Sequence, residues 1–340
     1  MAEEPARVTI NDGERVLPVR AGEPVLFALM GARIFVPSAC GGRGICGQCR
    51  LVIPGARGGP TDAEIALVSP ADRARGVRLS CQVPVVGEVA VRLPTGSLAA
   101  RPYRARVLEI RDETPDMRRL ILELEEPGGM RFEAGQYVQL VRPGTEDDER
   151  PVYRAYSIAS APSSTRLLTL LVARVAGEAG ELTRFVFQEL TEGRRVALNG
   201  PLGTFTLRPS RRELLFVAGG SGYAPIRSIL MDAAERGLPR PATLYFAARS
   251  LRDLFLLDEI RQIQRSLPAL RFVPVLSRPL PEDRWQGERG GIAAALARLL
   301  PTLDNHDVYL CGSPGMVDAC IAALRSRGLA EDRLVFDRFA

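Results

Sequence analysis

The 340-residue sequence predicts three successive domains: a small mixed domain with a cysteine loop, a small antiparallel β-barrel, and a doubly wound α/β domain. Three observations support this prediction. Closely spaced cysteines lie near the start, short strand-like segments separated by turns follow, and strand-like and helix-like segments alternate in the last third. The expected boundaries are 1–96, 101–209 and 212–340, with a Pro-, Gly- and Ser-containing linker at Pro94–Pro102.

Composition excludes several kinds of protein and of site. Hydrophobic residues are 46% and charged residues 25%, as in ordinary globular proteins. The longest uncharged stretch, Leu214–Ile226, is too short to span a membrane, and the polar segment Met1–Arg7 does not resemble a signal peptide. We therefore expect a cytoplasmic protein without a transmembrane segment, and we expect a monomer.

All basic residues are arginine, and His306 is the single histidine. One histidine excludes Rieske-type iron ligation, which needs two, and the lack of lysine excludes Schiff-base chemistry. The net charge of +5 is spread over single arginines and short pairs, so we expect no nucleic-acid partner. We expect His306 in a loop and Cys320 in the core.

Four of the six cysteines have the spacing of a metal-ligand set. Cys40, Cys46 and Cys49 form a C-x5-C-x2-C run, and Cys81 follows after a longer interval. Structural zinc usually takes two C-x2-C units, whereas three cysteines on one loop with a distant fourth is typical of a [2Fe–2S] cluster. We predict such a cluster on these four residues, with zinc or unliganded thiols as the alternatives. Residues without Cβ allow the loop to wrap tightly, and the loop contains Gly41, Gly42, Gly44 and Gly47.

The elements around the cysteines predict a small mixed fold. A capping box at Thr61–Glu64 opens a helical turn, and Gly31 ends a helix at Pro24–Met30. The expected strands are Arg7–Ile10, Arg15–Val19, Cys49–Ile53 and Arg78–Val85.

The middle of the chain predicts a barrel that binds a flat, phosphorylated ligand. In the strand Arg154–Ser160, Arg154 suits a diphosphate, Tyr156 a planar ring and Ser157 a ring nitrogen, although the stretch could also be an ordinary barrel strand. Gly180, Leu182 and Thr183 lie where the helix Glu181–Leu190 begins, a position that suits a phosphate. Gly200–Phe205 would allow close approach of the backbone to a ligand. The other expected strands are Tyr103–Ile110, Leu120–Glu125, Tyr137–Val141 and Leu167–Ala173.

The last third predicts a parallel sheet with a nucleotide-binding edge. The strand Glu213–Ala218 enters the glycine-rich turn Gly219–Pro225 and the helix Pro225–Arg236, which Gly237 ends. The segment Cys311–Met316 would follow another strand at the same edge. The remaining expected elements are the strands Thr243–Ala247, Arg271–Leu276 and Asp307–Cys311 and the helices Leu254–Leu267, Gly291–Leu300 and Met316–Gly328.

Together these motifs resemble the iron–sulfur flavoprotein reductases. The order of the three domains is similar to a β-grasp ferredoxin, a six-stranded FAD-binding barrel of the ferredoxin–NADP reductase type and an NAD-binding domain. In particular the sequence resembles the F subunits of sodium-translocating NADH:quinone reductases, through Ser38–Gly42, Cys46–Arg50, Arg154–Ser157, Pro281–Trp285 and Phe336–Phe339. The reductase components of phenol hydroxylase and methane monooxygenase are also similar. Three features depart from the F subunits: the missing membrane helix, the short segment Arg142–Tyr153, and Ser313 in place of a proline.

The resemblance implies roles for particular residues. Arg154, Ala155, Tyr156, Ser157 and Thr183 would bind FAD, with Ser157 near N5 of the ring. Cys311 would lie beside the nicotinamide, and Phe339, or else Phe336, would cover the flavin. The remaining residues expected to bind the flavin or the nicotinamide nucleotide are Gly180, Leu182, Gly219, Gly220, Gly222, Pro225, Arg249, Ser250, Gly312 and Met316.

The expected cofactors define the expected reaction. NADH, favoured here over NADPH, would deliver hydride to FAD, and single electrons would then pass through the cluster to an acceptor protein docked near Arg43 and Ile45. The resemblance favours the reductase component of a multicomponent oxygenase. The alternatives are a quinone-reductase module, a reductase of another metalloenzyme, and a redox sensor.

Overall fold

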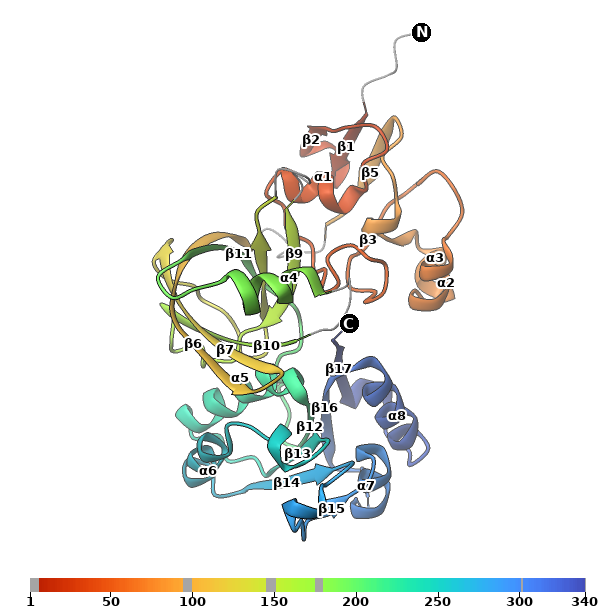
Figure 1. The fold of residues 1–340 in the computed structure, drawn as a ribbon. Coiled ribbons are helices and arrows are strands. Elements are labelled where there is room, and N and C mark those ends of the chain that lie inside the picture. Colours follow the sequence, from red (N-terminus) through yellow and green to blue (C-terminus); the bar gives the residue numbers. More distant parts are fainter. Residues whose placement is uncertain (1–5, 94–99, 145–150, 175–179, 301, 340) are drawn as a thin grey trace.

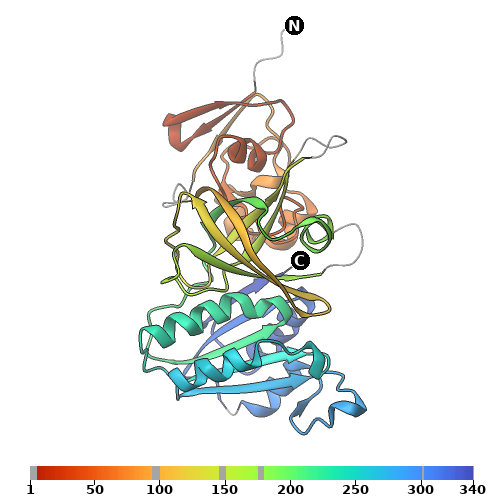
Figure 2. The ribbon, with the colours of Figure 1, turned by 60° about the vertical axis from the view of Figure 1, so that its left-hand side comes forward.

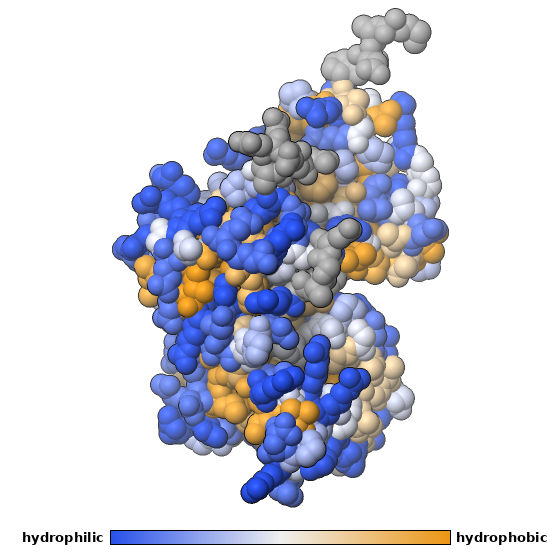
Figure 3. Space-filling view, in the orientation of Figure 1, coloured by the Kyte–Doolittle hydropathy of each residue, from blue (hydrophilic) through white to orange (hydrophobic). Residues whose placement is uncertain are grey.

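The computed structural model describes residues 6–93, 100–144, 151–174, 180–300 and 302–339. Three sheet-containing parts follow one another in chain order, which we call the N-terminal part, the barrel and the C-terminal part. In Figure 1 they are stacked from top to bottom, and Figure 2 shows the same stacking after a turn about the vertical axis. The chain's end returns to the middle of the stack, beside the barrel. The face in Figure 3 is largely hydrophilic, with apolar side chains in separate patches.

The N-terminal part has a three-stranded sheet in the order β2–β1–β5, which packs with helix α1 (Val25–Gly31) around Leu26 and Leu29. The capping box is confirmed, because Thr61 and Glu64 exchange both hydrogen bonds. The expected strand Arg78–Val85 is wrong beyond Leu79, because Ser80–Gln82 forms a 3-10 turn. The other elements are β1 (Arg7–Ile10), β2 (Arg15–Pro18), β3 (Arg50–Val52), β4 (Val77–Leu79), β5 (Glu88–Val91), α2 (Asp62–Leu67) and α3 (Pro70–Ala74).

The barrel is an antiparallel sheet in the order β10–β7–β6–β11–β8–β9, and a bridge between Ile158 and Leu170 joins its two ends. Sequence reasoning missed β11, where Val196 and Leu198 point into the core. The expected helix Glu181–Leu190 is present, but only α4 (Glu181–Arg184) is α-helical, and the chain continues as a π-helical turn over Phe185–Glu189, after which the Leu190 amide bonds to the Phe185 carbonyl. The strands are β6 (Arg101–Thr114), β7 (Met117–Glu126), β8 (Tyr137–Arg142), β9 (Val152–Ser157), β10 (Leu167–Ala173) and β11 (Arg195–Leu202). Most of the expected linker lies outside the described residues.

The C-terminal part is a parallel sheet in the order β15–β14–β13–β12–β16–β17. Helices α5 and α6 share one core and α7 and α8 the other, so the doubly wound prediction is confirmed. Cys320 is in the core as expected, whereas His306 begins β16 and is not a loop residue. The elements are β12 (Glu213–Gly219), α5 (Tyr223–Glu235), β13 (Ala242–Ala248), α6 (Leu257–Ser266), β14 (Leu270–Leu276), β15 (Glu288–Arg289), α7 (Ile292–Leu299), β16 (His306–Gly312), α8 (Pro314–Arg325) and β17 (Leu334–Arg338).

Candidate functional site

A cavity of about 710 Å³ lies where the three parts meet. This volume is within the range of cofactor and ligand pockets. Residues from all three parts line it, including Ala39, Arg43 and Gln48 of the cysteine loop. Of the residues expected to bind a cofactor, the structure places in this lining Arg154, Ala155, Tyr156, Ser157, Leu182, Thr183, Gly219, Gly220, Arg249, Gly312, Met316 and Phe339.

Strand β9 and helix α4 form the barrel side of the cavity. Burial lowers the pKa of Arg154, whose Nη1 donates to the Tyr153 carbonyl at 2.8 Å. A half-buried guanidinium that bonds to a neutral carbonyl suits an anionic ligand such as a diphosphate. Arg142 of β8 forms an ion pair with Glu181, which ties the start of α4 to the sheet. These contacts fit an FAD diphosphate between β9 and α4.

The glycines after β12 have different structural roles. Gly219 and Gly220 line the cavity, but Gly222 does not. A Cβ at Gly222 would collide with the backbone carbonyl of Cys311, so this glycine allows α5 to pack closely on β16. Pro225 is buried inside α5, and Gly180 precedes α4 without lining the cavity. A phosphate-binding role therefore remains a prediction with structural support at Gly219 and Gly220.

The end of β16 and the C-terminal strand complete the nicotinamide side. Cys311 is fully buried, and burial raises the pKa of its thiol well above the usual range. Its side chain is not part of the lining, whereas Gly312, Ser313 and Met316 are. Ser250 is also outside the lining and instead caps the turn that Asp253 closes. Of the two terminal aromatics, Phe339 lines the cavity.

The four cysteines of the N-terminal part form two pairs. Cys40 and Cys46 are hydrogen-bonded to each other, and so are Cys49 and Cys81. These bonds lower the pKa of Cys40 to about 4 and that of Cys81 to about 7, and they raise the pKa of Cys46 and Cys49. This pairing fits a cluster in which each of two iron ions takes two thiolate ligands.

Two further features of the cysteine loop fit a bound cluster. The buried hydroxyls of Ser38 and Ser80, which lie next to the cysteines in sequence, have no hydrogen-bond partner among the described residues. The loop glycines 41, 42, 44 and 47 all have positive φ. The unpaired hydroxyls and the positive φ of these glycines fit a loop that wraps around a bound cluster.

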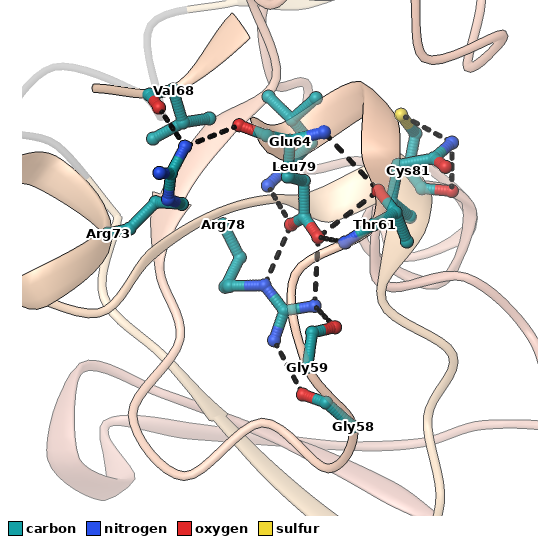
Figure 4. A network of polar contacts seen from close by, with 10 residues as sticks. Gly58, Gly59, Thr61, Glu64, Val68, Arg73, Arg78, Leu79 and Cys81 are labelled. Atoms are coloured by element: carbon teal, nitrogen blue, oxygen red, sulfur yellow. Dashed lines mark hydrogen bonds and ion pairs between the residues drawn. The ribbon is translucent and has the colours of Figure 1, made fainter. Parts of the chain in front are cut away.

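A buried ion pair supports the position of Cys81 (Figure 4). Glu64 accepts from Arg78 Nε at 2.7 Å and from the Leu79 amide at 2.9 Å, directly before the turn that carries Cys81. Burial opposes ionisation of Glu64, but the bonds from Arg78 and from the backbone hold its pKa below the usual value. Arg78 also binds the carbonyls of Gly58 and Gly59. This network joins α2, the preceding loop and β4 around the fourth cysteine.

Sequence reasoning missed three polar residues at the junction of the parts. Tyr137 of β8 accepts a hydrogen bond from the Ser38 amide at 2.8 Å, and Gln48 Nε2 donates to Asp337 at 2.9 Å. Burial raises the pKa of Asp337 to about 7. No local pattern indicates these contacts, because the partners are far apart in sequence. All three side chains line the cavity.

Comparison with protein families identifies all three parts. Residues 8–86 match the 2Fe-2S iron-sulfur cluster binding domain, residues 104–207 the oxidoreductase FAD-binding domain and residues 216–321 the oxidoreductase NAD-binding domain. The prediction of FAD, NADH and a [2Fe–2S] cluster as the cofactors is thereby confirmed. None of the helices in the described ranges has the length and apolar character needed to cross a membrane.

Characterised relatives match over nearly the whole chain. The F subunit of the Na⁺-translocating NADH-quinone reductase of Methylococcus capsulatus is 31% identical, over 100% of this chain and 92% of that protein. The corresponding protein of Neisseria meningitidis is 30% identical, over 98% of this chain and 91% of that protein.

Solved structures share the same architecture. A cytochrome P450 reductase from Amycolatopsis has a TM-score of 0.77 and 31% identity, with 98% of each chain covered. The ferredoxin reductase of a carbazole 1,9a-dioxygenase has a TM-score of 0.73 and 24% identity over both full chains, which shows the shared fold.

Proposed function

From the premise that this chain belongs to the iron–sulfur flavoprotein reductases, an oxidoreductase family with FAD, NADH and a [2Fe–2S] cluster, we propose that it is the reductase component of a multicomponent oxygenase. The chain would take electrons from NADH and deliver them singly to an oxygenase protein. The observation that carries this proposal is the whole-chain similarity to a cytochrome P450 reductase, and the shared cavity, which brings the nucleotide-binding edge, the flavin strand and the cysteine loop together, supports the electron route.

The residues around the cavity have separable roles in this proposal. Arg154 and Thr183 would hold the FAD diphosphate, and Ser157, buried at the end of β9, would bond to the flavin ring. Gly219 and Gly220 would accept the nicotinamide nucleotide, and Phe339 would exclude water from the ring. When bound, FAD converts a two-electron hydride donor into a source of single electrons. No protein acid or base is needed for this chemistry.

The oxygenase acceptor rests on whole-chain similarity. The Amycolatopsis P450 reductase and this chain cover 98% of each other at 31% identity. Beside the cysteines, Ile45 is about half exposed, which leaves this edge of the loop accessible to a protein acceptor. A docked acceptor would therefore approach the cluster at Ile45 and Arg43.

A quinone reductase module is the second candidate. The similarity to the F subunits at 30–31% identity favours it. Such a module would pass its electrons from the same cluster edge to a quinone-reducing complex, so the two candidates differ only in the acceptor.

Replacing one cysteine ligand tests the electron route. The Cys46→Ser variant should lose NADH-dependent cytochrome c reduction, because cytochrome c takes single electrons from the cluster, and should keep reduction of ferricyanide, which the flavin serves directly. Iron analysis and low-temperature EPR of the NADH-reduced proteins measure the cluster. Cytochrome c reduction at the wild-type rate in Cys46→Ser would contradict the assigned order.

The acceptor is tested separately with the wild-type protein. Reduced protein is mixed anaerobically with a bacterial cytochrome P450, a dioxygenase component and ubiquinone-1. Faster reduction of one oxygenase component than of the quinone supports the proposal. Reduction of the quinone alone would contradict it and favour the second candidate.

A further inference from the structure

We propose that Gln48, Tyr137 and Asp337 form a latch that positions the cysteine loop against the flavin-binding strands and so sets the rate of electron transfer from the flavin to the cluster. Each residue of the latch comes from a different part of the molecule. The inference rests on the electron route within the chain and is independent of the acceptor's identity.

The first half of the latch holds the loop from the barrel. Tyr137 is almost fully buried, and its hydroxyl accepts from the Ser38 amide at 2.8 Å. On the same strand, Gln139 Nε2 donates to the Ser38 carbonyl at 3.5 Å. A buried residue whose backbone N–H and C=O are both hydrogen-bonded has little freedom to shift. Strand β8 thereby fixes the backbone two residues before the ligand Cys40.

The second half holds the loop from the C-terminal strand. The Tyr137 hydroxyl donates to Gln48 Oε1 at 3.4 Å, and Gln48 Nε2 donates to Asp337 Oδ1 at 2.9 Å. Gln48 is the residue directly before the ligand Cys49, so its side chain moves with the cluster. Asp337 lies on β17, which is hydrogen-bonded to β16 at the nucleotide edge. The chain of bonds therefore runs from the nucleotide edge to both sides of the cysteine loop.

The chemistry of the latch suits positioning better than stabilisation. Each hydrogen bond makes only a small net contribution to the stability of the fold. Electron transfer from the flavin to the cluster, however, slows as the distance between them grows, so a shift of the loop changes this rate directly. Loss of the latch should therefore change electron transfer more than it changes the stability of the fold.

Exchanging the amide and the carboxylate between positions 48 and 337 tests the latch directly. In Gln48→Glu the amide group that donates to Asp337 is replaced by a carboxyl group, and the ratio of cytochrome c to ferricyanide reduction should fall severalfold. Asp337→Asn keeps an acceptor for Gln48 and should stay near the wild-type ratio. In the double variant the new amide at position 337 can donate to the new carboxylate at position 48, so the ratio should return to within about twofold of wild type. Iron content and the EPR line shape are measured for every variant.

A second pair of variants gives a readout other than activity. In Tyr137→Phe the Ser38 amide loses its acceptor, so its hydrogen exchange should become faster and the reduction ratio should fall. The matched control is Tyr309→Phe, because the Tyr309 hydroxyl also accepts a backbone amide, that of Arg208, at 2.8 Å, and the residue is also buried. The control should change neither the exchange of Ser38 nor the ratio.

Two results would overturn the latch. One is an unchanged ratio in Tyr137→Phe together with faster exchange at Ser38, which would show that the loop moves without consequence. The other is a double variant no better than Gln48→Glu alone, which would show that the two side chains do not act as a pair. Both results leave the proposed oxygenase acceptor untouched, since cytochrome c is the electron acceptor in these assays.

Discussion

The barrel meets its two neighbours through interfaces of different chemistry. Toward the C-terminal part the contacts include apolar packing and a charged network: Glu259 of α6 binds Arg119 of β7 at 2.7 Å and, within the C-terminal part, Arg227 of α5 at 2.5 Å. Arg227 also donates to the Ala159 carbonyl. Toward the N-terminal part the contacts are mostly uncharged, namely hydrogen bonds to Ser38 and the close approach of Gly41 to β9.

This difference separates two mechanical requirements. Hydride transfer needs the flavin and the nicotinamide in fixed contact, and a partly buried ion-pair network resists displacement because breaking it strands charges. Electron transfer to the cluster needs only a defined distance, which neutral hydrogen bonds and steric contact can set. We therefore expect changes at the charged interface to affect stability and changes at the neutral interface to affect rate.

Asp337 contacts the cysteine loop but carries an ionisable group, so we expect its substitution to change stability. This is the largest effect on the free energy of unfolding that we expect. Burial raises the pKa of Asp337 from 3.8 to about 7, so the native state binds this proton more tightly than the unfolded chain does. Its contribution therefore makes stability fall as pH rises from about 4 to about 7, by up to about 4 kcal/mol. Asp337→Asn should remove this loss and be more stable than wild type at pH 8. Urea unfolding at pH 5 and pH 8 measures the difference.

The difference between wild type and Asp337→Asn reports the titration of Asp337 alone, because all other titratable groups are the same in both proteins. The nearby cation Arg338 is paired with Asp318, so it does not neutralise Asp337. Parallel pH profiles for wild type and Asp337→Asn would show that Asp337 ionises normally in the native state.

Local sequence patterns predicted the elements better than the junction. The cysteine spacing, the capping box at Thr61 and the turn at Gly237, with its φ of +59°, depend on neighbours in the chain, and the structure contains the expected features. The latch has no such signal, because its bonds join residues 89 and 289 positions apart. A lone Gln48 or Tyr137 has no pattern that distinguishes it from any other polar residue.

At two places, glycines that predict a ligand site also have a packing role in the fold. Gly200–Phe205 suggested a ligand loop, but Gly200–Leu202 belongs to β11, and a Cβ at Gly203 would meet the Tyr137 ring. The alternation of Val196 and Leu198 was a strand signal that the glycines obscured. Gly222 belongs to a dinucleotide-type pattern, but the structure also requires a glycine there because a Cβ would collide with the backbone of Cys311.

Glu259→Gln tests the charged interface and should have the next largest effect. The substitution leaves Arg119 and Arg227, both about nine-tenths buried, without their shared carboxylate. Because Glu259 itself is about one-third exposed, we expect a loss of about 2 kcal/mol in the free energy of unfolding. Asp258→Asn, on the same helix and fully exposed, is the matched control and should change less than about 0.5 kcal/mol. Equal losses in urea unfolding would refute a special role for the buried network.

Gly41→Ala tests the neutral interface. Its free energy of unfolding should be close to that of the control variant Gly47→Ala. A Cβ at Gly41 would collide with the Tyr153 carbonyl and lie 2.6 Å from Arg154 Nη1, so the cysteine loop would have to move away from β9. Gly47→Ala is the control: its φ of +68° is close to the +66° of Gly41, so both variants carry similar backbone strain, but its Cβ would meet only side chains, the nearest being Leu67.

The expected difference is therefore in rate and not in folding. The ratio of cytochrome c to ferricyanide reduction should fall severalfold in Gly41→Ala and much less in Gly47→Ala. Equal ratios in two variants that retain their iron would mean that contact with β9 does not set the distance between flavin and cluster. The hydrogen bonds of Ser38 and Gln48 would then have to fix that distance alone.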